Sequence, residues 1–69
     1  MEVKEIIPNL NNKVIYDGSQ YVLTGATIRK DGQGKIFYQA EILDKNNNSV
    51  CIVKLEDIEI AKKEMEWLR

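Results

Sequence analysis

The chain of 69 residues contains no histidine and a single cysteine, Cys51. Without histidine it lacks the side chain that most often serves as a general base or metal ligand near neutral pH. One cysteine allows neither an intramolecular disulfide nor a metal site built from cysteines. A nucleophilic serine needs an activating base, and Ser19 and Ser49 both lie in predicted turns, where serine is common. We therefore expect no enzyme activity, no metal and no cofactor.

The chain also lacks a charge surplus and a long apolar run. Ten basic and eleven acidic residues give a net charge of −1, whereas nucleic-acid binding usually requires a basic surplus, at least on one face. No stretch approaches the roughly 18 apolar residues of a membrane span, so we expect no membrane association. Residues 1–5 lack the character of a signal peptide, and small secreted domains usually carry several disulfides. These features favour a reducing, cytoplasmic setting.

What the chain does contain is three turn signals between apolar or alternating segments. They are Asp17-Gly18, the Asp-Gly-Gln-Gly sequence at 31–34 and the Lys-Asn-Asn-Asn sequence at 45–48. Such turns supply the positive φ angles that tight hairpins need. They separate four strand-like segments, at 13–16, 21–30, 35–44 and 49–55. The pattern predicts a mainly β single domain built on an antiparallel meander, with a bulge or bend at Gly25 inside the second strand.

Alternation within the third and fourth segments predicts which side chains enter the core. In residues 35–44 one face is uniformly apolar and the other mostly polar, so the apolar face should be buried. The expected core side chains are Ile36, Tyr38, Ala40 and Ile42, and the expected accessible ones are Phe37, Gln39 and Glu41. Residues 49–55 are nearly all apolar, which predicts burial on both faces and makes Cys51 a buried, unreactive thiol.

The two ends of the chain carry weaker patterns. Residues 1–12 are predicted as an N-terminal arm, strand-like or irregular, because Pro8 disfavours helix at Ile7; Leu10 should turn inward. At the other end apolar residues recur at three- and four-residue spacing, which predicts an amphipathic helix at about 56–68 within the C-terminal segment 56–69. This helix would cover the fourth strand of a monomer or form a homodimer interface. Its apolar residues are Ile58, Ala61, Met65 and Leu68.

The sequence Val53-Lys54-Leu55-Glu56-Asp57-Ile58-Glu59, following three hairpin-linked strands, resembles the close of SH3-like small β-barrels. In that superfold a short 3₁₀ turn leads to a last strand. The resemblance covers roughly residues 13–60 and rests on the layout of the strands. It implies that the meander rolls into a small barrel, with a fifth short strand at 59–61 as the alternative to helix there. It implies no particular function.

Aromatic and basic residues supply the only candidates for a binding surface. The five aromatic residues are too many for one small core, and Phe37 is expected to point outward among polar neighbours, as a protein contact or a base-stacking surface does. Cover by the N-terminal arm or the C-terminal helix is the competing interpretation. Arg29, Lys30 and Lys35 form a local basic concentration around the second turn, which a solvated hairpin end also explains.

From these observations we predict a small non-catalytic interaction module that binds another protein. The rival hypothesis is a nucleic-acid-binding small β-barrel that uses Phe37, Tyr21 and the basic residues Arg29, Lys30 and Lys35. A steep dependence of binding on salt would distinguish the rival, since phosphate contacts release counterions.

Overall fold

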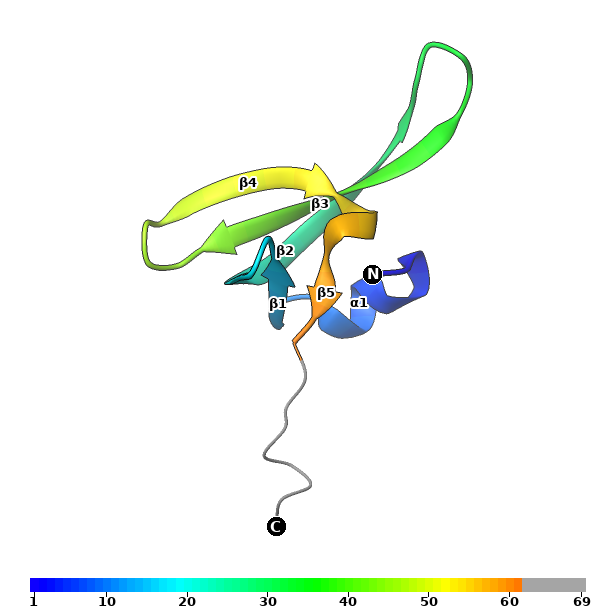
Figure 1. Cartoon of the computed structure of the whole chain (residues 1–69). Coiled ribbons are helices and arrows are strands. Elements are labelled where there is room, and N and C mark those ends of the chain that lie inside the picture. The colour runs from blue at the N-terminus through cyan, green and yellow to red at the C-terminus, as the bar shows by residue number, and fades with distance from the viewer. Residues whose placement is uncertain (62–69) are drawn as a thin grey trace.

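The computed structural model describes residues 1–61 and shows an antiparallel sheet preceded by a short helical segment (Figure 1). The sheet order is β4-β3-β2-β1-β5, which confirms the mainly β meander. The edge strands β4 and β5 do not pair with each other within residues 1–61, so the expected barrel is not closed there. The strands are β1 (Lys13–Tyr16), β2 (Ser19–Lys30), β3 (Ile36–Asp44), β4 (Ser49–Lys54) and β5 (Glu59–Ile60).

Each of the three predicted turns lies where the sequence indicates, and each is held by local chemistry. Asp17 and Gly18 both adopt positive φ angles, 52° and 78°, the combination that matches the twist of two strands joined by a two-residue loop. Asp31 Oδ1 accepts two backbone N–H groups of its own turn, each at 2.9 Å. Asp44 Oδ1 accepts two in the third turn, at 3.0 and 3.4 Å. These side-chain bonds replace the strand pairing that the turns interrupt.

The predicted irregularity at Gly25 is a β-bulge. The register between β2 and β3 shifts between Leu23 and Gly25, which leaves Thr24 as the extra residue. Its hydroxyl lies 3.0 Å from the carbonyl oxygen and 2.9 Å from Oε2 of Glu41 on β3, so its one hydrogen is shared between these two acceptors. A bulge bends its strand and increases the local twist. Beyond it, β2 and β3 sweep away from the rest of the sheet (Figure 1).

The hydrophobic core lies on one face of the sheet. Ala40 and Ile42 are fully buried, which confirms the predicted inner face of the third strand. Tyr38 is half-buried, whereas Ile36 is 50% exposed, because it lies beyond the point where β4 ends and the core stops. The placement of Ile36 in the core is therefore wrong. The buried core residues are Val14, Leu23, Ala40, Ile42, Leu55 and Ile58.

The fourth strand is buried on one face only, contrary to expectation. Val50 and Ile52 are each 55% exposed, while Cys51 and Val53 point the other way and pack against the core. Within residues 1–61 no element covers the outer face of β4, which is an edge strand. Cys51 is accordingly half-buried rather than a fully buried core thiol.

The N-terminal segment is helical, so the predicted strand or irregular arm is wrong. A 3₁₀ turn (Val3–Glu5) leads into α1 (Ile6–Asn9). Pro8 is tolerated because it lies in the first turn of α1, where backbone N–H groups have no partner within the helix. Leu10 is 37% exposed rather than turned inward.

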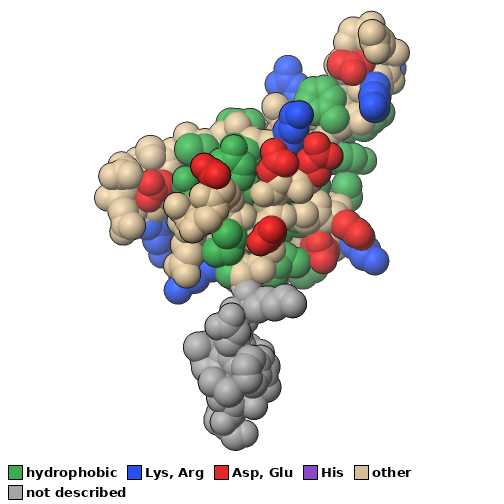
Figure 2. All heavy atoms as spheres, viewed as in Figure 1, with side chains coloured by type: hydrophobic (Ala, Val, Ile, Leu, Met, Phe, Trp, Pro, Cys, Tyr) green, Lys and Arg blue, Asp and Glu red, His purple; other side chains and the backbone are tan. Residues whose placement is uncertain are grey.

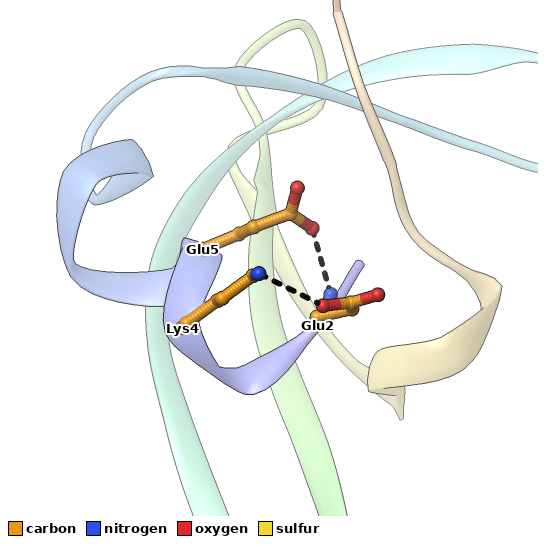
Figure 3. A network of polar contacts seen from close by, with 3 residues as sticks. All are labelled: Glu2, Lys4 and Glu5. Atoms are coloured by element: carbon orange, nitrogen blue, oxygen red, sulfur yellow. Dashed lines mark hydrogen bonds and ion pairs between the residues drawn. The ribbon is translucent and has the colours of Figure 1, made fainter.

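Contacts at the start of this segment hold it in place. Glu2 N–H donates to Glu5 Oε1 at 2.8 Å, and Lys4 Nζ lies 3.8 Å from Glu2 Oε1 (Figure 3). The Lys4–Glu2 pair is highly exposed and contributes little. The stronger anchor is the Met1 amino nitrogen, which donates to the carbonyl oxygen of Ile58 at 2.6 Å. It ties the start of the chain to the turn before β5.

The predicted helix at about 56–68 is wrong over residues 56–61. Leu55–Asp57 forms a 3₁₀ turn and the chain then enters β5, which pairs with β1 through Val14↔Ile60. A 3₁₀ turn repeats every three residues, so Leu55 and Ile58 both enter the core. The turn and short strand are the arrangement that the SH3-like layout implied. Residues 62–69, with the rest of the predicted helix, lie outside the described residues.

Among residues 1–61 no helix has the length and apolarity needed to cross a membrane.

Candidate interaction surface

The distal ends of β2 and β3 form a two-stranded projection. Pairing of β4 with β3 reaches only Gln39↔Lys54, and β1 covers only the start of β2. Beyond these points β2 and β3 pair with each other alone. We call residues 28–38 the arm, and Figure 1 shows it projecting past the rest of the sheet. Its cross-strand pairs are Ile28↔Tyr38, Arg29↔Phe37 and Lys30↔Ile36.

Large apolar side chains are exposed on the arm. Ile28 is 67% exposed, Ile36 50% and Phe37 36%. A two-stranded ribbon has no core of its own and is marginally stable in isolation. Single exposed apolar residues are ordinary on protein surfaces, but Ile28 and Ile36 lie close together on one face of the arm, with Phe37 on its opposite face. The proximity of Ile28 and Ile36 makes this face of the arm a candidate contact surface.

A hollow of about 540 Å³ lies between the arm, the N-terminal segment and the turn Leu55–Asp57. This volume is within the range of roughly 300–1,000 Å³ that accommodates ligands. Val3, 46% exposed, and Ile36 both line it, one from the N-terminal segment and one from the arm. The lining combines apolar with charged side chains: Met1, Val3, Ile36, Phe37, Tyr38 and Leu55 together with Asp31, Lys35, Lys54 and Glu56.

Two lysines, Lys35 and Lys54, and two carboxylates, Asp31 and Glu56, line this hollow. Within residues 1–61 the one ion pair joins Lys4 and Glu2, so neither Lys35 nor Lys54 is paired with a carboxylate there. Asp31 is engaged by the backbone of its turn. Figure 2 shows basic, acidic and hydrophobic side chains interspersed over the visible face and the arm. Within the described residues, Lys35 and Lys54 therefore offer two unpaired ammonium groups to a ligand, while Glu56 presents a carboxylate to the same hollow.

The structure brings together four of the five predicted site residues. Phe37 and Arg29 are direct cross-strand partners, with Lys30 on the next pair and Lys35 in the adjoining turn. Tyr21 lies at the other end of β2 and does not join them. The binding role of all five stays a prediction. With Phe37 36% exposed, the segments expected to cover it do so incompletely within residues 1–61.

Tyr21 belongs instead to a small aromatic cluster on the inner face. Its ring meets that of Tyr16 edge-on, with ring centroids 6.1 Å apart and planes at 71°. Partial burial, with Cys51 and Asp44 nearby, raises the pKa of the Tyr21 hydroxyl above its ordinary value. The shift means that the environment of Tyr21 in the folded chain favours its neutral phenol over the phenolate. Among residues 1–61 no group of three or more His, Cys, Asp or Glu side chains is placed to hold a metal ion.

Sequence reasoning missed Ile28 and Val3 and misplaced Ile36. A signal was present, however. The predicted second and third strands run for about ten residues, whereas the first and fourth are shorter. The distal ends of a long hairpin then have no third strand beside them, so their apolar side chains face solvent. Val3 carried no comparable signal, because its position depends on how the N-terminal segment folds back.

Comparison with protein-family models, with curated proteins and with solved structures finds no match for this chain. Inference about its function therefore rests on its own surface.

Proposed function

We propose that the chain is a non-catalytic interaction module that binds a segment of another protein in the hollow beside the arm. The observation that carries the proposal is the pair of half-exposed side chains, Val3 and Ile36, that line the hollow from two separate elements. An apolar side chain inserted between them would remove both from water. The two-stranded arm would gain the packing that it lacks in the free protein.

The charges specify the rest of the ligand. Lys35 and Lys54 line the same hollow and form no ion pair within residues 1–61. A carboxylate beside the inserted apolar residue would meet one of these ammonium groups. The favoured ligand is thus a protein segment that carries an apolar residue next to Asp or Glu. Covering a half-exposed aliphatic side chain contributes about 1 kcal/mol, so a few such contacts predict weak binding once the entropy of association is subtracted.

A nucleic-acid ligand is the second candidate, supported by the direct pairing of Arg29 with Phe37. This pairing places a cation beside an aromatic ring, the combination with which proteins bind single-stranded nucleic acids. The net charge of −1 and the distance of Tyr21 from the arm along β2 weigh against it. We rank it below the protein ligand.

Two broader assignments go with this function. The strand layout and the 3₁₀ turn before β5 support a relation to the SH3-like small barrels, in a form that is open within residues 1–61. The free thiol of Cys51 supports a reducing, cytoplasmic setting.

A displayed library of random peptides tests the proposal without a known partner. Peptides are selected for binding to the wild-type chain, and the binding of each selected peptide to the Ile36→Lys variant is then measured. This variant places a charge on one wall of the hollow. Gln33→Lys, in the exposed turn of the arm, is the matched control because it adds the same charge outside the lining. Multivalent display compensates for the weak affinity expected of a single site.

We expect enriched peptides that pair an apolar residue with Asp or Glu and that lose at least about tenfold in binding to Ile36→Lys, equivalent to about 1.4 kcal/mol. Binding to Gln33→Lys should be retained. Peptides that bind Ile36→Lys as well as wild type would refute the hollow as the site. Salt-dependent retention of single-stranded DNA or RNA, abolished by Arg29→Ala, would favour the nucleic-acid candidate instead.

A further inference from the structure

Within residues 1–61, no further strand pairs with the outer edge of β4. β4 ends the sheet, and its pairing with β3 is regular over six residue pairs. The edge of such a strand presents N–H and C=O groups that a further strand can bind, and natural proteins usually block it with lysine, proline or a bulge. Residues 49–53, Ser-Val-Cys-Ile-Val, contain none of these. The one cation, Lys54, comes only at the end of the strand.

An apolar surface runs across the outer face of the sheet and stops at this edge. Val50 is paired with Leu43 on β3, which is paired in turn with Val22 on β2. Leu43 and Val22 are half-buried, whereas Val50 and Ile52 at the edge are each 55% exposed. The exposed fraction thus rises toward β4, as expected of a sheet that continues into another strand.

The sequence of β4 is complementary to itself in an antiparallel pair. With Cys51 on a two-fold axis, Val50 lies opposite Ile52 of the second copy and Ile52 lies opposite its Val50. Lys54 then faces the uncharged Asn48 of the second copy, so no like charges meet. Centring the axis on Ile52 would instead place the Lys54 ammonium against Val50. Apolar matching and charge therefore both favour the axis at Cys51.

We propose that β4 pairs antiparallel with β4 of a second copy, with Cys51 on the two-fold axis, so that the two sheets become one continuous sheet. The partner strand comes from a second copy of this chain, because β4 places apolar residues opposite Val50 and Ile52 and brings no like charges together across the edge. The interface is separate from the arm and from the hollow, except that Lys54 lies at the end of β4.

Sedimentation equilibrium of the full chain tests the proposal. We expect a dimer for wild type and a monomer for Ile52→Lys, which places a lysine against Val50 of the second copy. This variant should stay folded, because Ile52 is 55% exposed and its cross-strand neighbour is Glu41, so circular dichroism should be unchanged. Ile28→Lys adds the same charge on the arm and should remain dimeric. A wild-type chain that is monomeric at about 1 mM, or an Ile52→Lys dimer, would overturn the proposal.

Oxidative cross-linking then tests the register. Facing residues of antiparallel strands have Cα atoms about 4.5–5.5 Å apart, within the range of about 4.4–6.8 Å that a disulfide spans. With copper phenanthroline as oxidant, two Cys51 thiols lose two protons and pass one electron to each of two Cu(II) ions, forming one S–S bond and two Cu(I). We expect wild type to cross-link as a dimer at low protein concentration.

The control is Cys51→Ser/Val53→Cys. In the proposed register position 53 lies opposite position 49, so the two introduced thiols are four residues apart along the strands, about 13 Å, and should not cross-link. Equal cross-linking of both proteins would indicate parallel pairing, and failure of both would exclude the β4 edge; either result overturns the proposal. The Ile36→Lys variant should still form the dimer, so a negative peptide-binding result at the hollow would not count against pairing of β4 strands.

Discussion

The contrast between Ile42 and Ile28 offers a direct measurement of where the core ends. Both are isoleucines in long strands of the same hairpin, but Ile42 is fully buried and Ile28 is 67% exposed. Replacing each with valine removes one methylene and keeps the β-branched side chain that strands favour. Strand propensity is therefore nearly unchanged in both variants. Any difference in the free energy of unfolding reports burial.

The expected magnitudes follow from the exposed fractions. A buried methylene contributes about 0.8 kcal/mol, and a small cavity term brings Ile42→Val to about 1 kcal/mol. Ile28 has about a third of its surface buried, so Ile28→Val should cost about 0.3 kcal/mol. A domain of this size has about 3–5 kcal/mol of stability in total. Ile42→Val should thus remain folded, whereas Ile42→Ala, at about 2–5 kcal/mol, should unfold most molecules.

Urea denaturation followed by far-ultraviolet circular dichroism measures the difference. With a slope of about 1 kcal/mol per molar urea, the midpoint should fall by about 1 M for Ile42→Val and by about 0.3 M for Ile28→Val. All proteins are compared at one concentration, because association would raise apparent stability. Gln39→Ala, on the other face of β3, should do little. Equal midpoint shifts for the two valine variants, or a larger one for Ile28→Val, would refute the assigned inner face and the boundary of the core.

Four further substitutions address the turn, the bulge and the inner aromatic cluster. Gly18→Ala should lower the free energy of unfolding by about 1 kcal/mol, because φ at this position is +78°. Gly25→Ala should leave it nearly unchanged, because the added Cβ would come no closer than 3.9 Å to Glu41. The urea midpoints of the two variants measure the difference. Thr24→Val removes the hydroxyl that bonds two oxygens of Glu41 and should cost about 1 kcal/mol in the same assay; no loss would show that the bulge does not need this bond. The raised pKa of Tyr21 means that folding favours the neutral phenol. Its contribution to the free energy of unfolding is therefore present below about pH 10 and is lost as the pH rises through the folded-state pKa. Tyr21→Phe should lessen the alkaline loss of stability, and this variant should lack a late-titrating phenolate absorbance that wild type shows.

Much of the candidate site followed from local pattern. The turn at 31–34 and the alternation of 35–44 placed Phe37 on the outer face of a hairpin, with Arg29, Lys30 and Lys35 around it. Tyr21 was the other aromatic residue assigned to the nucleic-acid surface, but it lies at the opposite end of the second strand from Arg29 and Lys30. The second strand has twelve residues and rises by about 3.3 Å per residue. Residues at one of its ends are therefore too far away to share a site with residues at the other end. The hollow itself was not predictable, since its walls come from segments far apart in the chain.

Short-range chemistry in the sequence determined the turns, the strands and the bulge at Gly25. A positive φ angle, an Asp carboxylate reaching back to its own turn and the two-residue period of a strand all act within a few residues. Tertiary structure alone decided three other features. The N-terminal segment folds into helix because Met1 and Ile6 pack against the core, which outweighs the unfavourable signal of Pro8. Residues 55–60 form a 3₁₀ turn and strand because Leu55 and Ile58 fill the core and β1 offers an edge. Val50 and Ile52 are exposed because β4 lies at the end of the sheet order, and the position of a strand in a sheet depends on every other strand.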